Sequence, residues 1–429
     1  MKDKGYPSRL FVEVTTKCNL TCSMCVKQNG KGGIPEGMMS PDTFDALTPL
    51  FPHLDSLVLN GIGESLLHPQ LETFIAKAKT FLPEQARVGF QSNGMALTDQ
   101  RAASLIDAGL DRICLSLDTV SDDSFRAIRG GGELRGVNAA FSSLHKAKRR
   151  YRKNAFEIGI EFVLMRSNLA ELPEAVRWAA RKGARFALVT QLLPYHKDLV
   201  AQTAYDTNTA GAVSIYERWK AKALREGVDI RDYFDIFMKY AKTKEDQRVI
   251  SCVEQMRNDA NAQGITLHLE RLLQRDEEWF AHAGRIFDEA RDVAREEKIE
   301  LTLPEMVPRN TRKCEFVEGD GAFVAWNGDV HPCYFLWHQY ACFVGGIEKR
   351  IKPWVFGNIR DRNILDIWND ENSRSFRERV LGYRFPFCFD CSFALCDYVG
   401  EADFEHDCYH ELVPCGACLW CTGLFQCLQ

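Results

Sequence analysis

The chain has 429 residues, of which 45% are hydrophobic and 26% are charged, and its formal net charge is -5. These values are ordinary for a globular protein, and no run of about eighteen apolar residues exists that could span a bilayer. The slightly acidic balance argues against a nucleic-acid-binding surface, which normally shows a basic face, so we expect neither a nucleic-acid nor a membrane partner.

The length exceeds the size at which one hydrophobic core keeps growing, so we expect one large domain and at least one smaller one. The first ten residues, MKDKGYPSRL, contain no apolar signal segment, and we therefore expect a cytoplasmic protein. The chain has 16 cysteines. In a reducing compartment, clustered cysteines more often bind metal or do chemistry than form disulfides.

The first half of the chain alternates short apolar runs with helical patterns. Candidate strands are residues 10–14, 56–59, 87–91, 112–117, 157–164 and 186–190, and candidate helices are 69–80, 98–108, 137–150 and 172–182, with a helix start at Ser40-Pro41-Asp42. Because helices separate successive strands, we expect an α/β fold with parallel strands. A full or partial barrel and an open doubly wound sheet both fit this pattern.

Residues 196–275 are polar and helical in pattern, for example at 205–226 and 229–244, and we interpret them as a helical insert. A helix at 277–297 and a strand at 299–303 then return to the first domain, which comprises residues 1–195 and 276–310. Residues 311–429 show short strands and tight turns, which predict a small cysteine-rich α+β domain. Asn327-Gly328 predicts a hairpin turn there.

Three cysteines follow the first candidate strand in a C-x3-C-x2-C spacing: Cys18, Cys22 and Cys25. A structural zinc site uses four ligands, whereas a four-iron cluster held by three thiolates leaves one iron free to bind another molecule. From the spacing alone, zinc and three unligated cysteines remain alternatives to an iron-sulfur cluster.

This motif, placed directly after the first strand of a sixfold βα pattern, resembles the signature of radical S-adenosylmethionine (SAM) enzymes. The resemblance implies a partial (βα)6 barrel in which SAM binds the open iron of a [4Fe-4S] cluster. It also implies reductive cleavage of SAM to a 5'-deoxyadenosyl radical, with electrons from a flavodoxin- or ferredoxin-type protein. The sequence departs from the family at Met24, where an aromatic residue is common.

Polar and glycine residues at later strand ends extend the resemblance. Radical SAM enzymes carry a Gly-Gly-Glu motif after the second strand, where glycine permits a close approach and the carboxylate accepts the SAM ammonium. Parallel-strand folds bind ligands at the carboxyl ends of their strands. The resemblance implies SAM contacts from Gly61, Gly63 and Glu64, from Ser92 and Asn93, from Ser116 and Asp118, and from Arg166 as a partner for the SAM carboxylate.

The C-terminal cysteines resemble the SPASM extension of radical SAM enzymes, which implies two auxiliary [4Fe-4S] clusters. A zinc ribbon is the alternative for such closely spaced pairs. Four residues separate Cys391 from Cys396, whereas five residues stand there in the family pattern. Which later cysteine binds which cluster therefore stays open. The implied ligands are Cys314, Cys333, Cys388, Cys391, Cys396, Cys408, Cys415, Cys418 and Cys427, with Cys421 a further candidate; Cys114, Cys252 and Cys342 fit no pattern and are expected to be buried or free thiols.

SPASM enzymes mostly modify peptides and proteins, so the resemblance implies a peptide or protein substrate, presented by the insert or by a separate recognition protein. Tyr334 stands where sulfatase-maturing enzymes carry an aspartate base, which argues against that activity, and no other base is assignable. The segment 414–427 also resembles maturases associated with tungsten-pterin oxidoreductases. An iron-sulfur electron carrier or a zinc-stapled scaffold is an alternative of another class, but it leaves the N-terminal cysteine motif unexplained.

Overall fold

The computed structural model describes residues 5–28, 33–391 and 403–429, so the expected ligand Cys396 lies outside the described residues. Within the described residues, no helix combines the length and the apolar composition needed to cross a membrane.

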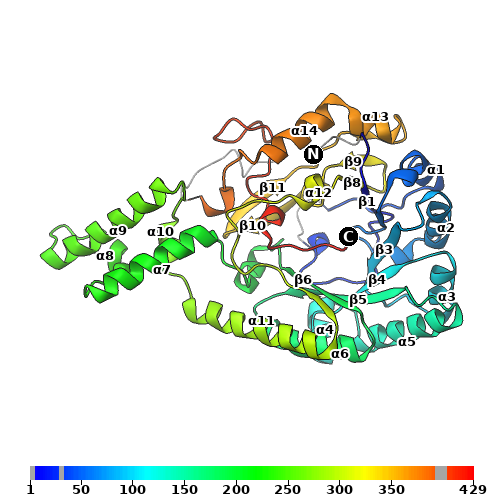
Figure 1. Cartoon of the computed structure of the whole chain (residues 1–429), viewed down its shortest axis with the longest axis horizontal. Coiled ribbons are helices and arrows are strands. Elements are labelled where there is room, and N and C mark those ends of the chain that lie inside the picture. Colours follow the sequence, from blue (N-terminus) through cyan, green and yellow to red (C-terminus); the bar gives the residue numbers. More distant parts are fainter. Residues whose placement is uncertain (1–4, 29–32, 392–402) are drawn as a thin grey trace.

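A curved sheet of ten strands occupies the centre of the molecule (Figure 1). Its βα strands lie side by side in sequence order and pair in parallel, whereas a doubly wound sheet reverses its order at a switch point. The partial barrel is therefore confirmed. Its strands are β1 (Arg9–Val12), β2 (Ser56–Val58), β3 (Arg87–Ser92), β4 (Arg112–Ser116), β5 (Glu157–Leu164), β6 (Phe186–Gln191) and, beyond the six units, β7 (Glu300–Thr302).

Helices cover the outer face of this sheet (Figure 1). Most begin where the sequence predicts: the Thr98 side chain accepts the Arg101 N–H at the start of α3. One of these covering helices was not predicted from the sequence: α4, which Ser121 caps and Gly130 ends. The covering helices are α1 (Pro41–Asp45), α2 (Leu71–Phe81), α3 (Asp99–Asp107), α4 (Asp122–Arg129), α5 (Leu134–Arg150), α6 (Leu172–Arg181) and α11 (Glu277–Glu297).

Side chains alternate between the two faces of each strand. On β1, Leu10 and Val12 pack against the helices, whereas Phe11 belongs to a separate inner cluster. That inner cluster also contains Val58 of β2 and Phe186 of β6. Strands so far apart in the sheet can share one cluster only because the sheet curves, and this cluster forms the apolar floor of the barrel.

The C-terminal region extends the same sheet. Strand β8 (Gly321–Val324) pairs in parallel with β1, and β9 (Asp329–His331) runs antiparallel to β8. Gly328 has a φ of 91° in the turn between them, which confirms the predicted hairpin. The other elements are β10 (Tyr340–Val344), β11 (Ile347–Ile351), β12 (Gly357–Asn358), α12 (Glu315–Glu318), α13 (Ile364–Asn369) and α14 (Glu371–Gly382).

Helices α7 (Ala210–Arg225), α8 (Tyr233–Phe237) and α9 (Lys244–Ala262) project from the barrel as an arm, at the left of Figure 1, and α10 (Leu269–Leu273) leads back. The expected helix at 229–244 is wrong, because the chain leaves the helix after Phe237 and starts a new one after Thr243. There, Thr243 and Asp246 accept each other's backbone N–H groups in a capping box, which fixes the start of α9.

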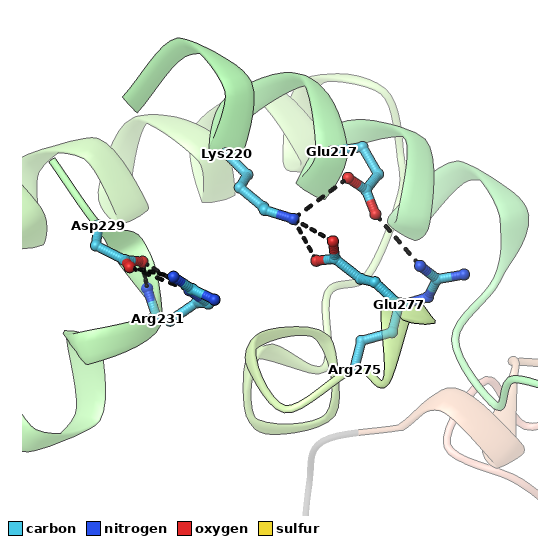
Figure 2. Close-up of polar contacts among 6 residues, drawn as sticks. All are labelled: Glu217, Lys220, Asp229, Arg231, Arg275 and Glu277. Carbon is cyan, nitrogen blue, oxygen red and sulfur yellow. Dashed lines mark hydrogen bonds and ion pairs between the residues drawn. The ribbon is translucent and has the colours of Figure 1, made fainter. Parts of the chain in front are cut away.

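Ion pairs fasten the base of the arm to the start of α11 (Figure 2). Lys220 of α7 pairs with Glu277, the first residue of α11, and Arg275 lies 3.3 Å from Glu217 of α7. Arg275 also pairs with the buried carboxylate of Asp206 at 2.6 Å. Because Arg275 is itself nearly buried, these contacts hold the arm in one orientation more firmly than surface pairs would.

The C-terminal tail runs into the barrel, and Figure 1 places the end of the chain at the centre of the curved sheet. The Gln426 N–H donates to the Thr190 hydroxyl at 3.1 Å, and Arg112, which begins β4, donates to the backbone oxygen of Gln429 at 3.1 Å. Leu428 joins the apolar floor. The tail therefore runs through the barrel from the carboxyl end of β6 to the amino end of β4, so that its last residue lies on the side opposite the strand ends that carry the expected SAM contacts.

Candidate active site

The loop that leaves β1 carries the three N-terminal cysteines. The end of α4 supports this loop: the Thr21 N–H donates to Gly130 O at 3.0 Å, and the Ser23 N–H donates to Ile128 O at 2.9 Å. A Cβ atom at Gly130 would stand 2.3 Å from Thr21 O, so only glycine permits this approach. The helix missing from the sequence prediction thus positions the loop with Cys18, Cys22 and Cys25.

The three thiols share a secluded environment. Burial, together with the nearby Cys22 and Cys18, raises the pKa of Cys25 to about 11. Burial also raises the pKa of Cys18. Such thiols stay protonated at neutral pH unless a cation compensates their charge, and iron ions do this when thiolates bind them. The donor set therefore fits an iron-sulfur cluster.

Among the described residues, no three His, Cys, Asp or Glu side chains stand close enough together to ligate a single metal ion. An iron-sulfur cluster makes a different demand, because each thiolate binds its own iron atom and the ligands stand around the cluster.

Glu64 connects the ends of β2 and β3. Its side chain is 3% exposed and accepts the Ser92 hydroxyl at 2.8 Å and the Asn93 N–H at 2.7 Å. Asn93 in turn donates from Nδ2 to Asn19 Oδ1 in the cysteine loop at 2.9 Å. Burial raises the pKa of Glu64, and these hydrogen bonds oppose that rise. The structure thus brings together Glu64, Ser92, Asn93 and the cysteine loop.

The two glycines before Glu64 permit a close approach, as expected, but to the chain itself. A Cβ atom at Gly63 would lie 2.3 Å from Thr15 O, and one at Gly61 would lie 2.3 Å from Cγ of Glu13. The Glu64 N–H donates to Lys17 O at 2.8 Å. The turn after β2 and the cysteine loop therefore pack backbone against backbone.

Asp118 and Arg129 form a buried ion pair behind the cysteine loop. Asp118 is 0% exposed, lies 2.5 Å from Arg129 Nε and accepts the Val163 N–H at 2.9 Å. The Cys22 Sγ lies 3.9 Å from the backbone oxygen of Arg129. Burial alone would lower the pKa of Arg129, but the negative charges of Asp118 and Cys22 outweigh this effect, so that the pKa is raised. Nη2 of Arg129 is buried without a hydrogen-bond partner among the described residues.

Arg166 does not reach this site. Its Nε donates to Thr203 O at 3.0 Å, its Nη1 lies 3.6 Å from Asp276, and its guanidinium stacks over Trp279 at 4.3 Å. The buried cation beside the cysteines is Arg129 instead. We had expected such a cation at the end of a strand, whereas Arg129 is the last residue of a helix. The available signal was the run Arg129-Gly130-Gly131-Gly132, in which glycines that end a helix follow a cation.

The C-terminal region brings late cysteines together around one apolar cavity. Burial raises the pKa of Cys314 to about 12 and raises that of Cys333 well above the usual value. The Arg312 guanidinium lies near several of these thiols and supplies positive charge. Soft, buried thiols beside a cation fit a cluster site. The cysteines that line the cavity are Cys314, Cys333, Cys415, Cys418 and Cys421.

Cys427 does not line the cavity but lies at its edge, where its Sγ accepts the indole N–H of Trp420, a lining residue, at 3.3 Å. Cys388 lies close to the cavity, since its N–H donates to Gly416 O at 2.9 Å. Cys391 is partly exposed and Cys408 exposed. Of the cysteines that fit no pattern, Cys114 and Cys342 are buried, as expected, and Cys252 is partly buried.

One feature inside the barrel escaped the sequence analysis. Above the apolar floor, each of the first five strands is associated with a polar residue that faces inward, either on the strand or just after its end, and we call this set the polar ring. Gln91 of β3 contacts Glu161 of β5 although β4 separates the two strands, so both side chains point into the barrel. The available signal was a polar residue at or near the carboxyl end of each apolar run. The polar ring consists of Glu13, Asn60, Gln91, Ser116 and Glu161.

Comparison with protein families gives two matches. A model of the radical SAM superfamily matches residues 12–179, and a model of the SPASM iron-sulfur cluster-binding domain matches residues 314–392. Together they cover more than half of the chain.

Comparison with characterised sequences finds a full-length relative. The tungsten-containing aldehyde ferredoxin oxidoreductase cofactor-modifying protein of Pyrococcus furiosus is 27% identical over 423 residues, which are 97% of this chain and 96% of that protein. GTP 3',8-cyclases of Mycobacterium ulcerans and Brucella abortus are 37% and 29% identical over 30% and 42% of this chain. These segments span 36% and 51% of the two cyclases.

Among solved structures, SuiB of Streptococcus suis bound to S-adenosylmethionine is similar with a TM-score of 0.50 at 11% identity, over 87% of this chain and 68% of SuiB. SuiB bound to its precursor peptide SuiA gives the same TM-score at 12% identity, over 90% of this chain and 70% of that chain. At this identity the likeness shows a shared fold.

Proposed function

The chain belongs to the radical SAM superfamily and carries a C-terminal SPASM domain, and on this premise we propose that it modifies the cofactor of a tungsten-pterin oxidoreductase. It is an enzyme that binds a [4Fe-4S] cluster and SAM. When bound, the cluster supplies the electron that cleaves SAM to methionine and a 5'-deoxyadenosyl radical, which takes hydrogen from the substrate. The observation that carries the choice of substrate is the likeness to the P. furiosus protein over almost the whole of both chains.

We propose that Cys18, Cys22 and Cys25 hold this cluster. Glu64 acts by tying the strand ends to the cysteine loop, with its remaining acceptor capacity available to the SAM ammonium. Arg129 replaces Arg166 as the proposed partner of the SAM carboxylate, because its unpaired Nη2 is buried beside Cys22. The other proposed contributors to the SAM site are Gly61, Gly63, Ser92, Asn93 and Ser116. Asp118, whose oxygens are both engaged, would act through Arg129.

We propose that the late cysteines are divided between two auxiliary clusters. The cavity favours Cys314, Cys333, Cys415 and Cys418 as ligands of one auxiliary cluster, with Cys421 as the alternative to Cys418. A second cluster would use Cys388, Cys391 and Cys408 together with Cys396. The sequence analysis also named Cys427 as a ligand, but we propose that it belongs to neither set, because it does not line the cavity.

Iron analysis distinguishes Cys418 from Cys427. The Cys418→Ala and Cys421→Ala double variant, reconstituted with iron and sulfide without oxygen, should lose about four of the roughly twelve irons that three four-iron clusters contain. Cys427→Ala should keep all of them, since its thiol is not among the groups that line the cavity. Iron and sulfide counts with Mössbauer spectra provide the measurement. Equal iron loss in both proteins would contradict the assignment.

Anaerobic reconstitution tests the function directly. The reduced enzyme, supplied with flavodoxin or ferredoxin, should convert SAM to 5'-deoxyadenosine, and deuterium should move from a labelled pterin cofactor of the oxidoreductase into that product. Oxidoreductase incubated with the enzyme but without SAM serves as the control. Full clusters with no 5'-deoxyadenosine would refute the radical step, and cleavage without transfer from the cofactor would refute the substrate.

The arm supports a second candidate, modification of a peptide or protein. Its far end exposes apolar side chains, with Phe237 54%, Met238 82% and Tyr240 106% exposed. Large exposed apolar groups gathered on one element are typical of contact surfaces. In this case the deuterium would come from a labelled peptide, with or without a separate recognition protein, and not from the pterin.

A further inference from the structure

The polar ring is unusual for the inside of a parallel barrel, where branched apolar side chains normally fill the core. The layer below it follows that rule, with Phe11, Val58 and Phe186 packed together. Burying polar side chains is unfavourable unless they find hydrogen-bond partners. A full layer of them, with one residue on or just after each of five strands, therefore indicates a site for a polar ligand.

The polar ring lies directly beneath the proposed SAM site. Asn60 is the residue before Gly61, Gln91 is the residue before Ser92, and Ser116 precedes Asp118 by two positions. A ligand that rests on the ring thus adjoins the strand ends where SAM would bind. This is the place from which a radical formed on SAM can take hydrogen.

Hydrogen bonds within the ring fix the orientation of two of its side chains. Asn60 donates from Nδ2 to Gln91 Oε1, and the Gln91 amide donates toward the Glu161 carboxylate. The Gln91 oxygen and nitrogen are both engaged in this way. Glu161, at the end of the series, keeps further acceptor positions, because a carboxylate offers about four.

The two carboxylates of the ring differ in their hydrogen-bond and ion-pair partners. Glu13 is 0% exposed, lies 3.0 Å from His338 Nε2 and accepts the Ile62 N–H at 3.1 Å. Glu161 is partly exposed, and no ion pair to it forms among residues 5–28, 33–391 and 403–429. Burial raises the pKa of Glu161 to about 7. The negative charge of Asp118 adds to this rise, whereas Arg129 and the hydrogen bond from Gln91 stabilise the carboxylate and limit it. Glu161 is the acceptor left for a ligand.

Aromatic side chains of the C-terminal domain face the same interior. Trp337 is partly exposed and packs edge-on against Tyr334 at 4.9 Å and Phe323 at 5.0 Å. The Tyr334 hydroxyl is buried beside the Asn60 side chain. Flat aromatic surfaces beside polar side chains suit a planar ligand with polar edges.

We propose that Glu161 accepts two adjacent N–H groups from the amino-pyrimidinone edge of a planar heterocycle, as found in pterins and guanine. The 2-amino group and the neighbouring ring N–H point the same way and match the two oxygens of one carboxylate. Trp337 and Tyr334 supply the aromatic wall beside it. This proposal rests on the proposed function and names the edge by which the substrate is recognised.

Two probes that differ at this edge test the proposal. Pterin carries the 2-amino group, whereas lumazine carries an oxygen there and lacks the paired donors. In equilibrium dialysis with the oxidised, cluster-loaded enzyme and SAM, the wild type should bind pterin at least about tenfold more tightly than lumazine, the ratio expected for one charged hydrogen bond. Glu161→Gln, which offers one acceptor and one donor, should remove or invert this preference.

Two further variants keep the result interpretable. Glu161→Asp retains the carboxylate, so it should bind more weakly but still prefer pterin. Glu157→Gln makes the same chemical change on the same strand, near the amino end where Glu157 pairs with Arg87, and should leave binding unchanged. Iron counts verify loading in each protein.

Several outcomes would overturn the proposal: no pterin binding by the wild type, equal binding of pterin and lumazine, an unchanged preference in Glu161→Gln, or binding of a peptide alone. Dialysis requires no SAM cleavage, so the two proposals fail separately. Pterin preference without 5'-deoxyadenosine would refute the radical function only, and deuterium transfer from the cofactor with no role for Glu161 would refute the recognition only.

Discussion

Replacing Cys22 with alanine is expected to abolish 5'-deoxyadenosine formation. Two thiolates cannot hold a cluster that already leaves one iron for SAM, and Cys22 is also the thiol closest to Arg129. The variant should retain the auxiliary clusters, because their candidate ligands surround a separate cavity. Iron should fall by about four of roughly twelve atoms per chain, while the spectra of the auxiliary clusters persist.

A matched control separates this loss from a general effect of removing a thiol. Cys252 is partly buried on α9 in the arm and fits no cluster pattern. Cys252→Ala should therefore keep its full iron content and cleave SAM at the wild-type rate. SAM cleavage that survives in Cys22→Ala would show that the N-terminal cysteines do not carry the catalytic cluster, and the enzyme mechanism proposed above would have to be abandoned.

The barrel strands could be predicted because their signal is local. Each strand is an apolar run bounded by turn or cap residues, and the predicted ends of β5 agree with the structure. The N-terminal cysteine motif is likewise contained within eight residues. The arm was harder, because its polar helices show weak periodicity and the capping box at Thr243 decides where the second one starts.

The site could be predicted only in part, because some of its residues come together through tertiary packing. Arg129 reaches Cys22 because a glycine-rich helix end packs on the cysteine loop, and spacing along the chain does not encode that contact. The late cysteines are a similar case. Cys421 lines the cavity and Cys427 does not, since the tail turns into the barrel after Leu424.

Asp118→Asn is expected to give the largest loss of stability. The sequence suggested that Asp118 contacts SAM, but both of its oxygens are engaged, one with Arg129 and the other with the Val163 N–H. An asparagine could still accept that N–H, yet it would leave a buried guanidinium without its counter-charge. Breaking a buried ion pair in this way costs about 3–5 kcal/mol. Urea denaturation of the cluster-free protein measures the loss.

Asp122→Asn provides the comparison, because Asp122 is exposed at the start of the same α4 helix. There the charge interacts only with the helix dipole, and its removal should cost less than about 1 kcal/mol. If Asp118→Asn proved equally mild, the ion pair would not be what holds Arg129 beside the cysteines, and Arg129 would lose its proposed role at the SAM carboxylate.

The double variant Asp118→Asn, Arg129→Met distinguishes a broken ion pair from simple loss of packing. If the cost comes from an unpaired charge, removing both charges should cost less than the sum of the two single changes, since neither partner is then left alone. Binding of the cluster should likewise reduce the stability loss of the Asp118→Asn variant. Cys22 becomes a thiolate when it binds iron, and its negative charge would partly replace the missing carboxylate beside Arg129. The stability loss should therefore be smaller in the loaded protein than in the cluster-free protein, whereas a packing defect would cost the same in both.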